Sequence, residues 1–185
     1  MLYYLSLGSN LGNREETLRQ AVKLIEQQVG HVLRCSSFFY SAPWGFESEN
    51  EFCNLCCAVE SSQDPLSVLR LTQTIERALG RTQKTQIIKH QTSNTKHQTS
   101  IYSDRPIDID LIRAFDDSGN EIKCEITNDQ NNESPYSEAD RSTEGRLEIS
   151  NLKSQMSSDT LLTLPHPLWQ ERDFVKIPLA EIITV

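Results

Sequence analysis

Two aspartates separated by one residue are the side chains of this sequence best suited to chemistry. Asp108 and Asp110 lie in the segment Arg105–Asp110, which otherwise reads as a buried strand. Alternate side chains of a strand share a face, so we expect both carboxylates to point the same way and Ile107 and Ile109 to point into a core. Two adjacent like charges repel unless a cation lies between them, and Mg²⁺ prefers hard oxygen ligands together with water and substrate phosphates. The pair therefore predicts a Mg²⁺ site.

Taken alone, the two aspartates are better explained as the wet face of an ordinary half-exposed strand, because short motifs match by accident. Further motifs decide between the two interpretations, and they are Leu7–Asn13, Gln73–Glu76 followed by Gly80–Arg81, and Leu164–Pro167 followed by Arg172–Phe174. Taken in this order with Arg105–Asp110, the chain resembles the 6-hydroxymethyl-7,8-dihydropterin pyrophosphokinases, folate-pathway enzymes that move a pyrophosphoryl group from ATP to a pterin alcohol. The resemblance covers about residues 1–82, 102–115 and 160–182.

On the ATP side, the resemblance implies that Asp108 and Asp110 hold two Mg²⁺ ions and that Arg81 and Arg105 donate to phosphate oxygens. These four residues are the expected catalytic set. The other expected ATP-binding residues are Gln73, Glu76, Lys84, Tyr102, Ile107, His166 and Arg172. Taken alone, Arg81 is better explained as a cation that stabilises a helix C-terminus. Gln73 and Glu76, three residues apart, would be an ordinary solvated helix face.

For the pterin, a flat bicycle with amide-like edges, a site needs stacking surfaces and a planar group that both donates and accepts hydrogen bonds. The resemblance implies that Phe52 and Phe174 enclose the ring and that the amide of Asn54 pairs with its edge. Without the resemblance, each phenylalanine is equally well explained by core packing. The loop Pro43-Trp44-Gly45 is expected to close over the same pocket.

Two other functions fit parts of the sequence. A different metal-dependent nucleotide or sugar-nucleotide transferase would use the two aspartates, but it would give Phe52, Asn54 and Phe174 no role. A non-enzymatic nucleotide-binding or interaction module would use the long insertions to recruit partners. Turnover of ATP with the pterin alcohol in the presence of Mg²⁺ would distinguish an enzyme from such a module.

Length and charge bound the organisation of the chain. Its 185 residues fit a single domain spanning 1–185, yet only 37% of them are hydrophobic. The segment from Asp116 to Asp159 contains 11 acidic and four basic residues, and this excess of acidic residues accounts for most of the net charge of −8. We expect polar insertions at about 84–103 and 116–159, the second mostly mobile. The sequence contains no stripe of basic residues that would indicate nucleic-acid binding. We expect a monomer that acts on small molecules.

Five cysteines, three of them clustered as Cys53, Cys56 and Cys57, are typical of small core residues in a reducing compartment. A metal or redox role for Cys53-x-x-Cys56 lacks a second Cys/His pair at zinc spacing. The segment Met1–Tyr4 lacks the basic start of a signal peptide, and no stretch approaches membrane-spanning length. These features favour a cytoplasmic protein.

The elements that must position these residues follow from hydrophobic spacing. We expect strands at 2–7, 30–40, 52–60 and 107–112, a helix from Asn13 to about Gln28 that begins with a capping box, and a helix from Asp64 to Gly80. This order is that of a ferredoxin-like α+β sandwich, in which helices cover one face of an antiparallel sheet. The polar repeat at 89–93 and 96–100 predicts a tolerant loop, in which a metal site at His90 and His97 is the less favoured alternative.

Overall fold

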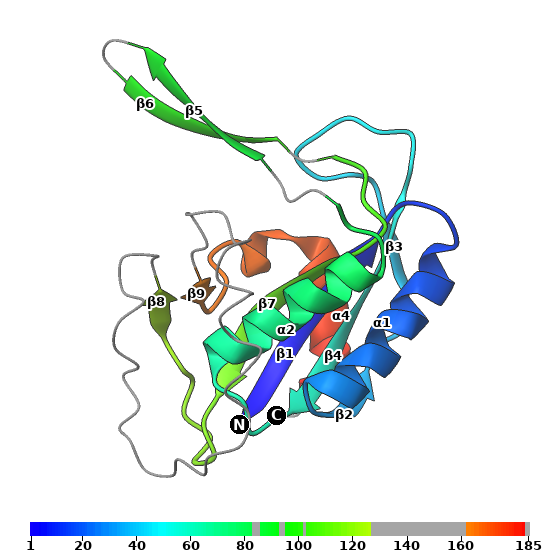
Figure 1. Cartoon of the computed structure of the whole chain (residues 1–185), viewed down its shortest axis with the longest axis vertical. Coiled ribbons are helices and arrows are strands. Elements are labelled where there is room, and N and C mark those ends of the chain that lie inside the picture. Colours follow the sequence, from blue (N-terminus) through cyan, green and yellow to red (C-terminus); the bar gives the residue numbers. More distant parts are fainter. Residues whose placement is uncertain (83–85, 93–94, 102, 127–161, 184–185) are drawn as a thin grey trace, which may run out of the picture.

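The computed structural model describes residues 1–82, 86–92, 95–101, 103–126 and 162–183. Its centre is a five-stranded antiparallel sheet in the order β2-β4-β1-β7, with β3 also paired to β4. The strands are β1 (Leu2–Ser9), β2 (His31–Cys35), β3 (Phe39–Ser41), β4 (Phe52–Glu60) and β7 (Asp108–Phe115). Together with two helices, these strands give the α+β order expected from the sequence (Figure 1).

Two helices cover one face of this sheet, as predicted. In α1 (Arg14–Gln28) the side chain of Asn13 accepts a hydrogen bond from the Glu16 amide at 3.3 Å. In α2 (Pro65–Ala78) the carboxylate of Asp64 accepts from the amides of Leu66 and Ser67 at 3.0 and 3.1 Å. These caps satisfy backbone donors that a helix leaves open at its N-terminus. The apolar stripes of both helices complete the main core with one face of the sheet.

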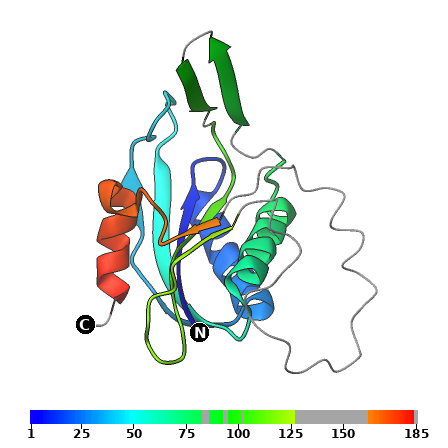
Figure 2. The same ribbon diagram turned by 90° about the vertical axis from the view of Figure 1, so that its left-hand side faces the viewer.

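A third helix, α4 (Asp173–Ile182), lies on the opposite face of the sheet and was not expected (Figure 2). It follows a short 3₁₀ turn, η2 (Trp169–Glu171). Its side chains Val175, Leu179 and Ile182 form a second core. The sheet contributes residues from the face opposite the main core, and these are Tyr4, Cys56, Ala58 and Ile112. Pro178 lies inside α4, and because proline normally breaks a helix, this helix could not be predicted from the sequence.

The polar segment that was expected to be a loop contains a β-hairpin instead. Among the strands that the structure describes, β5 (Gln86–Thr92) and β6 (Thr95–Ile101) pair only with each other, and their register places His90 opposite His97. Figure 1 shows this hairpin extending away from the central sheet. Isoleucine and threonine favour extended backbone, and their frequency in both strands outweighs the polar composition on which the prediction rested.

The remaining elements differ from expectation mainly at their ends. The run expected at 30–40 divides into β2 and β3, and the last central strand extends to Phe115. Within the predicted insertion 116–159, residues 116–120 form a turn and β8 (Cys124–Ile126) pairs with β9 (Leu162–Leu164). The expectation for 127–159 falls outside the described residues. No helix in the described part of the chain is long and apolar enough to cross a membrane.

Candidate active site

The two aspartates lie at the start of β7, on the face of the sheet that carries α4. Asp108 and Asp110 alternate with buried Ile109 and Leu111, as the sequence predicted. Their side chains are 19% and 38% exposed. Ile107 is fully buried in the main core, so only its backbone is available to a nucleotide. The expected metal ligands are therefore side by side and accessible.

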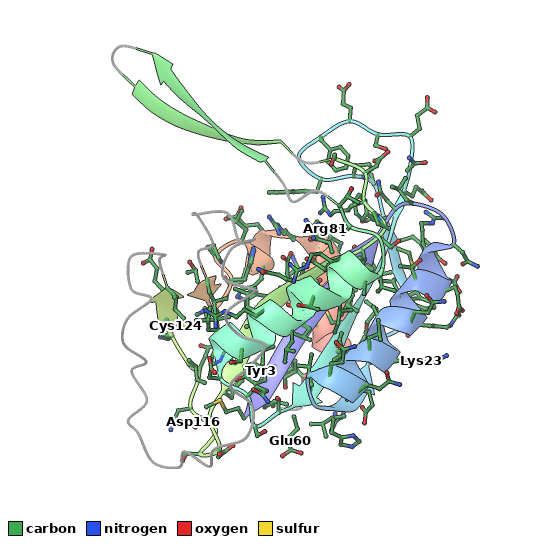
Figure 3. All side chains as sticks on the ribbon, viewed as in Figure 1. Tyr3, Lys23, Glu60, Arg81, Asp116 and Cys124 are labelled. Carbon is green, nitrogen blue, oxygen red and sulfur yellow. The ribbon has the colours of Figure 1, made fainter. Side chains whose placement is uncertain are left out.

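Two arginines bind Asp108 from different segments. Arg81 lies just beyond the end of α2 (Figure 3). It donates to Asp108 Oδ1 through Nη1, and the same nitrogen contacts Glu76 Oε1 at 2.5 Å. Arg105 Nη2 lies 2.6 Å from Asp108 Oδ2. Glu76 is buried and also accepts the Ile109 amide at 2.7 Å, so it joins α2 to the strand that carries the aspartates. The structure thus gives Glu76 a structural task that the sequence did not reveal, while Gln73 lies buried one turn earlier.

The charge balance of this cluster shifts the pKa values of its carboxylates. Burial, and then the charge of Asp108, raise the pKa of both Glu76 and Asp110 to about 7. Burial opposes ionisation of Asp108 as well, but Arg105 and Arg81 outweigh it and hold the pKa of Asp108 below its usual value. The carboxylate with the least protein compensation is therefore Asp110.

Arg172 and His166 reach the same region from the C-terminal part of the chain. Arg172 Nη1 lies 3.9 Å from Asp110 Oδ2, and its buried Nε has no hydrogen-bond partner among the described residues. His166 Nδ1 accepts the Leu168 amide at 3.3 Å. Burial, and then the charge of Arg172, lower the pKa of His166 to about 4, so its imidazole is neutral at physiological pH. Both side chains offer N–H groups to an anion.

The expected pterin residues adjoin this cluster. The guanidinium of Arg105 lies 5.2 Å from the ring centre of Phe52, and that of Arg172 lies 4.5 Å from Trp44 and 5.9 Å from Phe174. Phe52 is buried and Phe174 is half-buried, and each lies beside one of the arginines. The structure therefore brings both expected stacking residues next to the arginines of this cluster.

Asn54 and Gly8 connect the two halves of the site. Gly8 on β1 is paired with Asn54 on one side and Asp108 on the other. A Cβ atom at Gly8 would lie 3.0 Å from Asn54 Oδ1 and 3.6 Å from the ring of Phe52, so only glycine leaves this approach free. Asn54 Nδ2 donates to Phe39 O and to Ser41 Oγ, each at 3.1 Å, which fixes the orientation of the amide.

The loop Pro43–Gly45 lies at this end of the sheet, with Trp44 39% exposed and Gly45 at a φ of 80°. Phe46, which was not among the expected site residues, packs edge-on against Phe52 with ring centres 6.2 Å apart. Its place two residues after Trp44 was the signal that could have found it. Lys84 and Tyr102 lie outside the described residues.

The donor set fits a hard divalent cation. Asp108 and Asp110 present carboxylate oxygens on one face of a strand, and Asp110 gains most from a nearby positive charge. No group of three or more potential metal-ligating side chains occurs among the described residues. A cation held here would take its other ligands from water and phosphate, which is the usual coordination of Mg²⁺.

The known proteins to which this chain is similar are pterin pyrophosphokinases. The family model for 7,8-dihydro-6-hydroxymethylpterin-pyrophosphokinase matches residues 4–184. A 2-amino-4-hydroxy-6-hydroxymethyldihydropteridine pyrophosphokinase of Porphyromonas gingivalis is 35% identical over 98% of this chain and 90% of its own length. A protein of the same name from Bacillus subtilis is 30% identical over 97% of this chain and 76% of its own length.

A solved structure described as HPPK-DHPS in complex with substrates shares the fold. Its TM-score is 0.56 at 17% identity, and the match covers 98% of this chain and 40% of that one. The family match extends over nearly the whole sequence and includes every segment that builds the site. The chain therefore belongs to the 7,8-dihydro-6-hydroxymethylpterin-pyrophosphokinase family.

Proposed function

We propose that this protein transfers the pyrophosphoryl group of ATP to 6-hydroxymethyl-7,8-dihydropterin, giving AMP and the pterin diphosphate in folate biosynthesis. Membership of the pyrophosphokinase family supports the reaction class. The single observation that carries the proposal is the cluster at the start of β7, where Asp108 and Asp110 lie among Arg81, Arg105 and Arg172, next to an aromatic surface.

Asp108 and Asp110 would hold Mg²⁺, and two ions are expected from the family resemblance. When bound, the metal would neutralise the triphosphate and favour attack by the alcohol on the β-phosphorus. The chain supports this binding with its own electrostatics. Asp108 is kept ionised by two arginines, and the proton that Asp110 carries near its pKa of about 7 would leave when a cation approaches.

The arginines and His166 would bind the phosphates. Arg81 is fixed by Glu76 and Asp108, so its planar guanidinium is already oriented before ATP arrives. Arg172 has a buried Nε ready to donate, and neutral His166 can donate from Nε2 because its Nδ1 accepts the Leu168 amide. Such preorganised donors stabilise the charge that develops on the leaving AMP and on the transferred group.

The aromatic residues and Asn54 would bind the pterin. Phe52 and Phe174 offer apolar ring faces on either side of the arginine cluster. Because Asn54 Nδ2 already donates to Phe39 O and Ser41 Oγ, its Oδ1 is the atom best placed to accept a hydrogen bond from the amino edge of a pterin. A sugar-nucleotide transferase would leave this arrangement without a purpose.

A coupled assay tests the proposal by measuring AMP with ATP, Mg²⁺ and the pterin alcohol. We expect AMP only when all three are present, and none when EDTA replaces free Mg²⁺. AMP or ADP formed at the same rate without the pterin would contradict the reaction. The predictions of a monomeric, cytoplasmic enzyme are tested separately, by analytical ultracentrifugation and by cell fractionation.

A further inference from the structure

A hydrogen-bonded carboxylate next to the site has no place in the function proposed above. Asp104 immediately precedes Arg105, and its Oδ1 accepts Asn10 Nδ2 at 2.6 Å while its Oδ2 accepts Asn50 Nδ2 at 2.8 Å. Ser48 also hydrogen-bonds to this carboxylate, and these donors lower the pKa of Asp104. One ionised side chain thus joins three segments that are far apart in the sequence.

The first of these segments follows the end of β1, where Asn10 binds both the backbone N–H and the backbone carbonyl of Arg105. Asn10 Oδ1 accepts a hydrogen bond from the backbone N–H of Arg105 at 2.8 Å, and the backbone N–H of Asn10 donates to the Arg105 carbonyl at 3.2 Å. Asn10 is only 3% exposed. A buried amide whose donor and acceptor are both used fixes its neighbours closely, because any movement leaves a polar group unsatisfied.

The second segment is the loop from Phe46 to Glu51, which leads into Phe52. Asn50 is exposed, and its own amide donates to Ser48 Oγ at 3.1 Å, so Asp104 binds two residues of this loop. The loop carries Phe46, whose ring packs edge-on against Phe52. Arg105 in turn contacts both the ring of Phe52 and the carboxylate of Asp108.

We propose that Asp104 is a positioning residue that fixes Arg105 against the aromatic loop, so that the phosphates of one substrate and the ring of the other are aligned for transfer. The inference rests on the proposed function, because it gives Arg105 and Phe52 their ligands. Asp104 itself need not touch either substrate. Its effect on the rate passes through the guanidinium of Arg105, and a displacement of about 1 Å at a reacting centre is enough to lower a rate about a hundredfold.

The test replaces Asp104 with asparagine, which keeps its size but puts an NH₂ group against one of the two amide donors. We expect kcat at saturating ATP and pterin to fall about tenfold. The matched control is Asp116→Asn, since Asp116 also accepts from an asparagine side chain, Asn120 Nδ2 at 3.1 Å, but lies at the far end of β7 (Figure 3). The two variants should lose similar thermal stability, and the control should keep wild-type kcat.

Two further variants separate positioning from a general loss of structure. The double variant Asp104→Asn/Asn50→Asp restores a carboxylate–amide pair between the loop and the Arg105 segment. It should recover a large part of the kcat that Asp104→Asn alone loses. In an Arg105→Lys background, Asp104→Asn should change kcat by less than about twofold, because a residue that acts through the guanidinium has nothing left to position.

The outcomes distinguish this inference from the proposed function. A wild-type protein that forms no AMP with the pterin would overturn the proposed function and this inference together. If the wild type is active and Asp104→Asn has the same kcat, the inference alone would be overturned. An equal loss of kcat in the wild-type and Arg105→Lys backgrounds would also overturn it, since Asp104 would then act independently of Arg105.

Discussion

Asp108 and Asp110 should respond differently to the same substitution, although both are expected metal ligands. Asp108→Asn removes the charge that compensates Arg81 and Arg105, whose side chains are only 8% and 14% exposed. Breaking a buried ion pair costs about 3–5 kcal/mol, and we expect about 3 kcal/mol here because asparagine keeps one oxygen acceptor. For a chain of this size, that loss lowers Tm by about 6–12 °C.

Asp110→Asn should have the opposite effect on stability. The pKa of Asp110 is raised from 3.8 to about 7, so its ionised form is disfavoured in the folded protein at pH 8. A shift of this size corresponds to about 4 kcal/mol for a buried group. Solvent screening of a side chain that is 38% exposed reduces this to about 1 kcal/mol. The variant should therefore be slightly more stable than the wild type at pH 8.

The pH dependence provides the internal control. Because the folded pKa of Asp110 lies above the unfolded value, the wild type loses stability as the pH rises from about 4 through 7. The advantage of Asp110→Asn should accordingly be largest at pH 8 and should vanish near pH 4. Thermal unfolding in the presence of EDTA measures both variants without bound metal.

Activity should fall in both variants. Loss of a metal ligand costs about two to four orders of magnitude in AMP formation, equivalent to about 3–5 kcal/mol of transition-state stabilisation. Near-normal activity in either variant would make the pair ordinary surface charge. Equal destabilisation by the two substitutions in EDTA would refute the electrostatic reasoning even if both were inactive.

Three further predictions concern other parts of the molecule. Gly8→Ala should raise the KM for the pterin about tenfold or more and leave the KM for ATP within about twofold, because the added Cβ crowds Asn54 Oδ1 at 3.0 Å and shifts the amide. Steady-state kinetics with each substrate varied will measure this, and an equal rise in both KM values would contradict it. His166 should stay neutral down to about pH 5 in the ligand-free protein, because its pKa is lowered from 6.5 to about 4. Since the folded state then binds fewer protons, His166 weakens stability as the pH falls from 6.5 toward 4, and His166→Gln should flatten this decline relative to the wild type, as followed by unfolding and imidazole NMR. Deleting seven residues, 89–95, removes one period of the repeat and should leave Tm within about 2 °C, because among the described strands β5 and β6 pair only with each other. A large fall in Tm would show that the hairpin supports the core.

The fold was predictable where local signals were strong. Asn13 and Asp64 cap α1 and α2 as expected, and the alternation from Asp108 to Leu111 gave β7 and its two faces. α4 was missed because Pro178 hides a helix whose stability comes from packing against the sheet rather than from its own sequence. The β5–β6 hairpin was not predicted because the polar composition of this segment is typical of a loop, although its isoleucine and threonine residues favour extended backbone.

The site was predictable as a set of residues but not as a network. The spacing of Asp108 and Asp110 pointed to a metal site, whereas the arginines and the aromatic pair were expected only because the motifs resemble those of a known family. The pairing of Glu76 with both Arg81 and the Ile109 amide depends on how α2 packs against β7, which a single sequence does not reveal. The same holds for the links from Asp104 to Asn10 and Asn50, which join positions 94 and 54 residues apart.

The central claim is that two phosphates move together from ATP to a pterin. Reaction of γ-labelled ATP with Mg²⁺ and 6-hydroxymethyl-7,8-dihydropterin, followed by chromatography of the products, tests it most directly. We predict that the label appears in a pterin diphosphate, with one equivalent of AMP and no ADP. Label recovered as free phosphate or as a pterin monophosphate, with ADP as the nucleotide product, would contradict the account.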